Sequence, residues 1–295
     1  AIDGADILMV VVPAYGHKNV AEKLAPHLED GQTIVLNPGR TCGAIEFDKV
    51  LRDSGSNADV TIAETQTLIY VARHLEFARA RIFQINNTVP LAALPAYRTS
   101  SALKALRVAY PQFVSGTNVL VTGLDNIGAV LHPGITLLNA ARIEATHGNF
   151  EYYIEGTTPS VCRVLDAMDK ERRAVADALG VRTHSTREWL YLSYDSPGRT
   201  LYDAIQGTPC YKGVMAPGTL MHRYILEDVP MSLVPIASLG KLLKVPTPSI
   251  NAMIQLAGTL HETDFWAIGR TVERLGLKGM TMKDIRMYVT GGRDK

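Results

Sequence analysis

The opening part of the chain alternates short, continuous apolar runs with segments of helical periodicity, and this alternation constrains the fold more than any other feature. The apolar runs ILMVVVP, QTIVLNPG and DVTIAET begin at residues 7, 32 and 59, and the helical patterns HKNVAEKLAPHL and AIEFDKVLRDSG lie between them. Strands that are apolar on both faces and are joined by helices form parallel sheets with helices packed on both sides. The sequence therefore predicts an α/β domain built around a parallel sheet.

Two further extended segments, 81–87 and 91–96, and a helix at 100–110 complete this first domain, which we place at residues 1–118. A Rossmann domain is the default interpretation of such a pattern, but no GxGxxG motif occurs in the chain. A mononucleotide-binding half takes two strand–helix units, and this chain opens directly on a strand. We therefore expect an incomplete Rossmann-type parallel sheet domain whose first half precedes this sequence. A complete three-layer α/β domain that never bound a dinucleotide is the alternative.

Near residue 119 helix-period stretches replace the strands. Thr158 is a suitable N-cap for the long helical segment that follows it, Pro159 suits its first turn, and Gly180 suits its end. The predicted helical stretches are 119–147, 158–180, 200–206, 236–244, 248–260 and 262–276, with a Pro- and Gly-rich loop at 207–218. The second domain, residues 119–295, is thus predicted to be all-helical.

Composition and charge exclude several classes of protein. The 30 Lys and Arg residues nearly balance 29 Asp and Glu residues, the net charge is +1, and no basic stripe is present. A nucleic-acid partner is therefore not expected. No apolar run reaches the roughly 18 residues that span a bilayer, and the apolar start lacks the basic lead of a signal peptide. Membrane association is therefore not expected either.

The three cysteines, Cys42, Cys162 and Cys210, are far apart and lack CxxC or Cys/His ligand spacing. This pattern argues against a disulfide framework and a structural zinc site, so we predict no bound metal. Each thiol is expected to be a small core side chain rather than a nucleophile. The cysteine usage indicates a reducing, cytoplasmic location.

Candidate ligand contacts follow the predicted strands, because ligands of open α/β sheets bind beyond the carboxyl ends of the strands. Arg40 lies beside a glycine turn at such an end, where a guanidinium can bind a carboxylate, although a surface arginine would look the same. The predicted cofactor contacts are Val12, Pro13, Asn37, Gly39 and Glu64. Ordinary turn chemistry would also explain the proline and glycine residues at these ends.

An ionisable residue and a helix breaker, His132 and Pro133, stand side by side in the apolar helical run GAVLHPGITLLNAARIE. Counted at about 100° per residue, His132 falls on a polar stripe beside the apolar face of this helix. A proline kink exposes backbone, as helix breaks at functional sites often do. A hydrogen-bonded core histidine beside a tolerated kink is the simpler alternative. The polar stripe comprises Thr122, Asp125, His132, Thr136 and Asn139.

The segment HRYILEDVP places Arg223 and Asp228 five residues apart, just before a proline. A histidine, a carboxylate and an arginine can form an acid–base pair with a carboxylate anchor, as reduction of a 2-keto acid requires. Sequence spacing does not show that these groups meet.

Four longer segments resemble the opine dehydrogenases, the NAD(P)-linked octopine/nopaline dehydrogenase family, and the similarity runs the length of the chain. The segments are VLNPGRTCGAIEF, NIGAVLHPGITLLNAARIE, YYIEGTTPSVCRVLDAMDKER and YILEDVPMSLVPIASLGKLLKVPTP. The resemblance implies a Rossmann domain followed by a helical domain, with the active site in the cleft between them. It also implies condensation of an amino acid with a 2-keto acid such as pyruvate, and reduction of the resulting imine with NADH or NADPH.

The resemblance carries roles to individual residues. His132 matches the catalytic histidine of the family, Asp228 the aspartate that pairs with it, and Arg223 an arginine that holds a substrate carboxylate. From this resemblance we predict that His132 and Asp228 lie within hydrogen-bonding reach, in a cleft facing the ends of the strands at 7–12 and 33–37. Asn126 is a further candidate for substrate binding, and Arg40 falls where related members carry other residues. The expected partners are therefore small-molecule substrates, an amino acid and a 2-keto acid. A homodimer is compatible with the apolar faces of the helical domain.

Two other functions stay open at this point. A ketopantoate-reductase-like 2-keto acid reductase would share the architecture but uses a catalytic lysine, and no lysine occurs between Lys104 and Lys170. A non-catalytic binding or scaffold protein that lacks the dinucleotide half is the second alternative.

Overall fold

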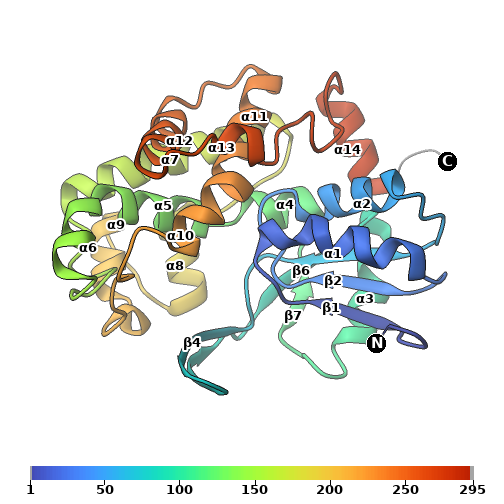
Figure 1. Ribbon diagram of the computed structural model, residues 1–295, viewed down its shortest axis with the longest axis horizontal. Helices are drawn as coiled ribbons and strands as arrows, with labels where there is room; N and C mark the ends of the chain where they lie inside the picture. Colours follow the sequence, from blue (N-terminus) through green and yellow to red (C-terminus); the bar gives the residue numbers. More distant parts are fainter. Residues whose placement is uncertain (1, 293–295) are drawn as a thin grey trace.

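The computed structural model describes residues 2–292, and within this range five strands form the main sheet (Figure 1). The strands are β1 (Ile7–Val10), β2 (Thr33–Leu36), β3 (Thr61–Thr65), β6 (Val89–Leu94) and β7 (Phe113–Ser115), in the spatial order β1-β2-β3-β6-β7. The first three are parallel, with Val10 opposite Leu36 and Leu36 opposite Glu64. Their carboxyl ends therefore lie along one edge of the sheet, as the sequence predicts.

Alternate side chains of the central strands point to opposite layers of helices. Ile34 and Leu36 pack in the core that contains Ile45 and Phe47 of α2 (Gly43–Asp53). Val35, between them, belongs to a second core with α3 (Thr99–Leu106). All three strand residues are fully buried, so the continuous apolar run reflects a strand that is covered on both faces. The helix α1 (His17–Leu24) lies beside α2.

The sheet is predominantly parallel, as predicted, but the pair of β3 and β6 is antiparallel. Strand β6 runs antiparallel to β3, and the chain between them forms a separate hairpin of β4 (Tyr70–Glu76) and β5 (Arg79–Ile85). The extended segment predicted at 81–87 therefore pairs within this hairpin and not with the main sheet. A parallel return would need a helical crossover, whereas the hairpin lets the chain re-enter in the opposite direction. Figure 1 shows the hairpin projecting below the sheet.

Helices make up the second half of the described chain. They are α4 (Val119–Leu124), α5 (Gly128–Leu138), α6 (Ala140–Thr146), α7 (Pro159–Ala178), α8 (Thr186–Tyr194), α9 (Leu201–Gly207), α10 (Arg223–Leu226), α11 (Val234–Leu243), α12 (Pro248–His261), α13 (Phe265–Ile268) and α14 (Met282–Gly291). A π-helical turn, η5 (Val229–Leu233), joins α10 to α11. Among the described helices none has the length and apolarity to cross a membrane. The division of the chain at residue 118 stays a prediction.

The helix termini show where local sequence signals were sufficient. Thr158 caps α7 by accepting a hydrogen bond from the Val161 amide at 3.3 Å, and Pro159 is the first helical residue, both as predicted. The stretch 119–147 is not one helix, because it is interrupted between α4 and α5 and again at Asn139. The predicted helix at 262–276 is also wrong. Only Phe265–Ile268 is helical there, since Glu262 is left-handed (φ 49°) and Gly269 is extended.

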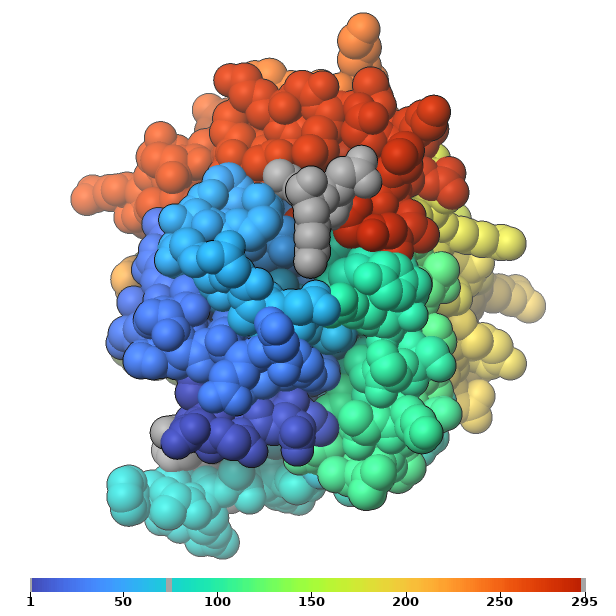
Figure 2. Space-filling view, turned by 90° about the vertical axis from the view of Figure 1, so that its right-hand side faces the viewer, coloured from blue at the N-terminus to red at the C-terminus, as the bar shows by residue number. Residues whose placement is uncertain are grey.

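The end of the chain returns to the sheet half. The hydroxyl of Tyr288, on α14, donates a hydrogen bond to Asp48 of α2 at 2.5 Å, and α14 also packs on η3 (Ala96–Arg98). Figure 2 shows this C-terminal segment, in red, directly above the blue and green atoms of the sheet half. The two halves are therefore joined on two sides, at the strand ends and along α2.

Candidate active site

A pocket lies where the carboxyl ends of β2 and β3, the β4–β5 hairpin and the helical half meet. The strand ends contribute Pro38, Arg40, Gln66, Thr67 and Leu68; the hairpin contributes Tyr70, Val71, Ala72, Phe83 and the following Asn86; and the helical half contributes Asp125, Asn126, Ile127, Gly128, Leu131, His132, Tyr153, Trp189, Tyr194, Cys210, Tyr211, Val214, Arg223 and Tyr224. The predicted residues Arg40, Asn126, His132 and Arg223 thus share one cavity.

His132 and Asp228 are in direct contact, which confirms the predicted juxtaposition. Nδ1 of His132 lies 2.8 Å from Oδ2 of Asp228. The Asp228 side chain is fully buried, whereas 17% of the His132 side chain is exposed, so the histidine faces the pocket and the carboxylate lies behind it. A carboxylate on Nδ1 fixes the tautomer of a neutral imidazole, which leaves Nε2 as the nitrogen that exchanges protons.

Two tyrosines hold the imidazole ring from other sides. The ring of Tyr224 stacks on it, with centroids 4.2 Å apart and an interplanar angle of 20°. The hydroxyl of Tyr153 lies 3.2 Å from Nε2 of His132. The remainder of the predicted polar stripe does not face the pocket as a unit, because the Thr136 hydroxyl bonds to Tyr152 at 2.8 Å.

Arg40 is a buried ion-pair partner in this structure, not a surface arginine. Its guanidinium contacts both oxygens of Glu227 and Oδ1 of Asp228, each at 3.4 Å, and its NH1 group also donates to Oδ1 of Asn126 at 3.4 Å. Gly128 is needed beside it, because a Cβ at this position would lie only 2.9 Å from the guanidinium. Arg40 therefore bridges the two carboxylates behind His132.

Glu227 joins the sheet half to the helical half at the pocket. It is buried, and it accepts hydrogen bonds from the Ala14 amide, just past the end of β1, at 2.9 Å and from Arg223 at 3.1 Å. Burial alone would raise the pKa of Glu227, but the charges of Arg40 and Arg223 lower it to about 2. Glu227 is therefore an anion at any working pH, and it fixes Arg40 and Arg223 in place.

The pKa of His132 is lowered from its ordinary value, mainly by burial. The paired Asp228 opposes this by stabilising the imidazolium, while the positive charges of Arg40 and Arg223 add to the lowering. The two arginines, Glu227 and Asp228 balance to zero charge. An anionic substrate entering the pocket would therefore favour protonation of His132.

The remaining substrate candidates occupy the pocket wall. Asn126 is buried, and its amide donates to the Ser232 hydroxyl at 3.0 Å. Arg223, with 39% of its side chain exposed, is the more accessible of the two guanidiniums, since Arg40 is 8% exposed. Arg223 is therefore the better placed group to bind a carboxylate in the cavity.

The predicted cofactor contacts are not gathered in this pocket. Glu64 is fully buried, and its oxygens accept from the Ala44 amide at 2.8 Å and the Thr122 hydroxyl at 2.7 Å. Burial raises the pKa of Glu64 to about 7. Gly39 is a glycine because a Cβ there would lie 2.4 Å from Glu64. The prediction that Glu64 and Gly39 contact a ligand is not supported, because both serve to pack the sheet edge against α2 and α4.

Three more predicted contacts lie at the same edge but do not line the pocket. Asn37 is buried, and its side-chain oxygen accepts from the Thr65 hydroxyl at 3.1 Å. Val12 is half-buried and Pro13 is exposed, beyond the end of β1. Contact of Val12 and Pro13 with a cofactor stays a prediction.

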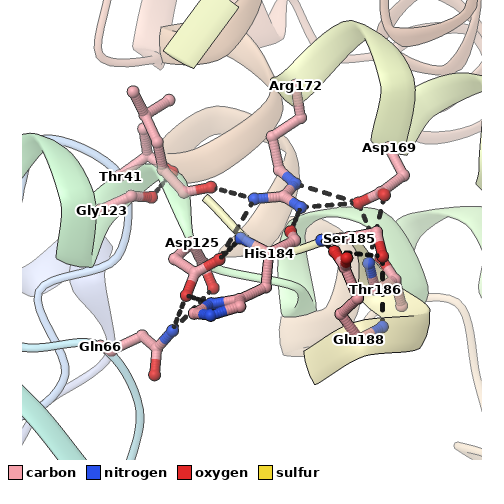
Figure 3. A network of polar contacts seen from close by, with 11 residues as sticks. Thr41, Gln66, Gly123, Asp125, Asp169, Arg172, His184, Ser185, Thr186 and Glu188 are labelled. Atoms are coloured by element: carbon pink, nitrogen blue, oxygen red, sulfur yellow. Dashed lines mark hydrogen bonds and ion pairs between the residues drawn. The ribbon is translucent and has the colours of Figure 1, made fainter. Parts of the chain in front are cut away.

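A second polar network braces the wall beside the catalytic candidates (Figure 3). Asp125, between α4 and α5, accepts from the Gln66 amide at 2.7 Å and contacts Nδ1 of His184 at 2.9 Å. Arg172, on α7, lies 3.8 Å from Asp125 and pairs with Asp169 at 2.7 Å. Burial raises the pKa of Asp125, and His184 and Arg172 counteract that rise. The network fixes the start of α5, and hence His132, relative to the loop after β3.

The pocket chemistry suits a nicotinamide ring. Pro38, Thr67 and Leu68, at the ends of β2 and β3, are uncharged and line the same cavity as His132. Ligand sites of this kind are mostly apolar, with a few polar groups that fix orientation. These three residues are the ones that would hold the nicotinamide end of the cofactor.

Two of the three thiols are core side chains, as predicted, whereas Cys210 lines the pocket. Cys42 and Cys162 are buried, Cys210 is partly buried beside the pocket, and all three are free. Burial raises the pKa of Cys42 to about 12, so it is a core side chain and not a nucleophile.

A predominantly parallel sheet whose strand ends face a histidine–aspartate pair on a helical half is compatible with a two-domain NAD(P)-linked oxidoreductase. Comparison with known proteins narrows this class. The family model described as NAD/NADP octopine/nopaline dehydrogenase, alpha-helical domain, matches residues 115–261. The chain is 43% identical over 289 residues to an opine dehydrogenase of Arthrobacter sp. (strain 1C), covering 98% of this chain and 80% of that protein. The chain belongs to the opine dehydrogenase family, and it is an NAD(P)-dependent oxidoreductase that acts on a CH–NH bond.

More distant relatives agree with this assignment. An octopine dehydrogenase of Mizuhopecten yessoensis is 25% identical over 87% of this chain and 70% of its own length. A solved structure of octopine dehydrogenase in complex with NADH and agmatine matches with a TM-score of 0.78 at 22% identity, over 99% of this chain and 79% of that one. Family membership decides against both alternatives, the ketopantoate-reductase-like enzyme and the non-catalytic scaffold.

Several functional candidates escaped the sequence analysis. Glu227 stands next to Asp228, and its spacing of four residues from Arg223 could have suggested an ion pair. Tyr153 and Tyr224 gave no signal, because aromatic residues are common core side chains. Their role becomes visible only in the structure, where both contact the imidazole ring of His132.

Proposed function

We propose that this pocket is the catalytic centre for the NAD(P)H-dependent reductive condensation of an amino acid with a 2-keto acid such as pyruvate. The observation that carries the proposal is the His132–Asp228 contact at the pocket wall, in a chain of the opine dehydrogenase family. In this reaction the keto acid and the amino group form an imine. NAD(P)H, when bound, supplies the hydride that reduces it.

His132 acts as the general acid and base. Asp228 accepts the Nδ1–H bond and keeps Nε2 directed away from the carboxylate and toward Tyr153 at the pocket. A protonated His132 can deliver a proton to the imine nitrogen as its C=N bond is reduced, and a neutral His132 can accept that proton in the reverse reaction. Tyr224, stacked on the ring, excludes water from one face of the imidazole and limits its rotation.

Arg223 and Asn126 bind the substrate. Arg223 offers an accessible guanidinium on the pocket wall, and a keto-acid carboxylate bound there would add the negative charge that favours the His132 imidazolium. Asn126 supplies a buried amide to the pocket wall. Its oxygen accepts a hydrogen bond from Arg40, and this bond fixes the orientation of the amide and of the guanidinium. Arg40 itself stabilises the anionic Asp228 and is enclosed behind the dyad.

The test is an assay of NADH and NADPH oxidation with pyruvate and a panel of amino acids. We expect turnover with at least one amino acid. Arg223→Ala is expected to raise the KM for the keto acid far more than it lowers kcat, because the carboxylate contact exists in both the ground and the transition state. A large fall in kcat with an unchanged KM would remove Arg223 from substrate binding.

Two further properties belong to this proposal. We place the enzyme in the cytoplasm, which the three free thiols support, and we propose the domain division at residues 118 and 119. We also propose that two copies pair through the helical half, because that half exposes large apolar side chains, among them Leu256, Leu260 and Trp266. Sedimentation equilibrium would test the pairing.

A further inference from the structure

We propose that the hydroxyl of Tyr153 relays the proton between His132 and the substrate nitrogen, so that Tyr153 is a second catalytic residue. The inference rests on the proposed function, because it assigns a step of the same reaction. Its starting point is the position of the hydroxyl, 3.2 Å from Nε2 of His132, the ring nitrogen that Asp228 leaves available.

The histidine is held so that Nε2 keeps facing this hydroxyl. Asp228 holds Nδ1 at 2.8 Å, and the Tyr224 ring stacks on the imidazole at 4.2 Å. Rotation of the ring would break both contacts. Nε2 is therefore kept directed at Tyr153 by the carboxylate on one side of the ring and by the stacked Tyr224 ring on its face.

The side chain of Tyr153 is also fixed by its neighbours. Its ring stacks on Tyr211 at a centroid distance of 3.8 Å and an angle of 11°, and it packs edge-on against Tyr152 at 4.9 Å. The Tyr152 hydroxyl donates to the carbonyl oxygen of His132 itself at 2.8 Å. The segment that carries Tyr153 is thus hydrogen-bonded to α5 at His132, the residue that would pass its proton to Tyr153.

The relay also reaches the substrate. Tyr153 lines the pocket together with His132 and Arg223, and its side chain is largely buried, so little water competes for its hydroxyl. An imine nitrogen next to the Tyr153 oxygen can then receive a proton without direct contact with Nε2.

The step balances as a double proton transfer. The His132 imidazolium loses its Nε2 proton to the tyrosine oxygen, while the tyrosine O–H bond breaks and its proton forms the N–H bond of the product. The imine carbon gains a hydride from NAD(P)H, and the imine becomes a secondary amine. Tyr153 ends as it began, and His132 ends neutral.

The experiment compares Tyr153→Phe with Tyr211→Phe, its matched control in the same stacked pair. Both substitutions keep the rings and remove one hydroxyl, and thermal melts check that both proteins are folded. We expect Tyr153→Phe to lower kcat roughly 10²-fold, the lower range for a positioned acid–base group. The solvent-isotope proton inventory of kcat should be curved for the wild type and for Tyr211→Phe, since two protons move, and linear for Tyr153→Phe.

A second readout needs no turnover. In the neutral ring of wild-type His132, Nε2 accepts the Tyr153 hydroxyl, so Tyr153→Phe should move the ¹⁵N resonance of Nε2 toward that of an unbonded imidazole nitrogen. An active Tyr153→Phe enzyme with wild-type kcat and a curved proton inventory would overturn the relay. A wild-type protein that condenses no amino acid with pyruvate would instead overturn the proposed function.

Discussion

Two histidines lie at the two junctions between the sheet half and the helical half, and their ring nitrogens contact side chains of opposite charge. His132 faces the pocket and contacts a carboxylate, Asp228, at 2.8 Å. His17, at the start of α1, is fully buried, and its Nδ1 accepts a hydrogen bond from Arg270 at 3.0 Å. Burial and the Arg270 charge lower the pKa of His17 to about 3. His17 therefore stays neutral where His132 can change charge.

The junction around His17 is a structural clamp. Arg270 pairs with Glu46 at 2.6 Å and donates to the carbonyl oxygens of Gly39 and Ala14 at 3.0 and 3.2 Å. Arg274 contacts the other oxygen of Glu46. The clamp thus holds the loops after β1 and β2. Arg40 lies in the second of these loops and extends from it into the pocket. One junction fixes the backbone, and the other presents a titratable group to a cavity.

The contrast shows that burial and charge partners do not by themselves mark a catalytic histidine. Both histidines are in ion-pair networks, but only His132 combines an anionic partner with access to a pocket. An anion favours the imidazolium and so permits proton transfer, whereas a cation opposes it.

The largest expected effect is on turnover. His132→Gln should lower kcat for imine reduction by roughly 10²- to 10⁴-fold, because the glutamine amide cannot act as a general acid or base. His17→Gln, which retains a hydrogen-bond acceptor for Arg270, should change kcat less than threefold, roughly the scatter of a remote substitution. Steady-state assays at equal folded concentration check this. Equal losses in the two variants would abolish the distinction between the junctions.

A substantial effect on stability is expected at the clamp. Arg270→Met removes one of the two arginine partners of Glu46 and the hydrogen bonds to the Gly39 and Ala14 carbonyls, and it should lower the free energy of unfolding by about 2–3 kcal/mol, since buried acceptors lose their donor. Urea unfolding measures it. Arg40→Met should cost less stability, because the contacts of Arg40 to Glu227 are longer, at 3.4 Å, and Glu227 keeps Arg223 as a partner at 3.0 Å, but it should reduce kcat. An Arg270→Met protein of wild-type stability would contradict the clamp.

The smallest effect concerns acid sensitivity. Since the pKa of His17 is lowered in the folded state to about 3, its contribution to stability is present above the unfolded value of about 6.5 and is lost as the pH falls toward 3. His17→Gln should therefore flatten the decline in melting temperature between pH 6.5 and 4. A slope identical to that of the wild type would mean that His17 is not the responsible group.

Local signals and family resemblance predicted much of this molecule. The alternation of apolar runs located β1, β2 and β3, and Thr158 located the start of α7. The pairing of His132 with Asp228, 96 residues apart, came from the resemblance and is confirmed by the contact. Spacing alone could not have brought these two residues together.

What was missed depends on tertiary packing. The oxygens of Glu64 accept hydrogen bonds from the Ala44 amide and the Thr122 hydroxyl. No local sequence signal distinguishes such a carboxylate from one that faces a ligand. The direction of β6 depends on a hairpin that pairs with itself and not with the sheet. Tyr153 matters only because its segment folds back on α5.

The central claim is that His132, tuned by Asp228, is the acid of the reaction, and the pH dependence of kcat/KM for the keto acid tests it most directly. In the reductive direction the wild-type rate should fall as the pH rises through the His132 pKa, since the protonated form is needed. Asp228 raises that pKa, so Asp228→Asn should move the falling limb to lower pH as well as reduce the rate. A limb that stays at the same pH in Asp228→Asn, or that persists in His132→Gln, would contradict the account.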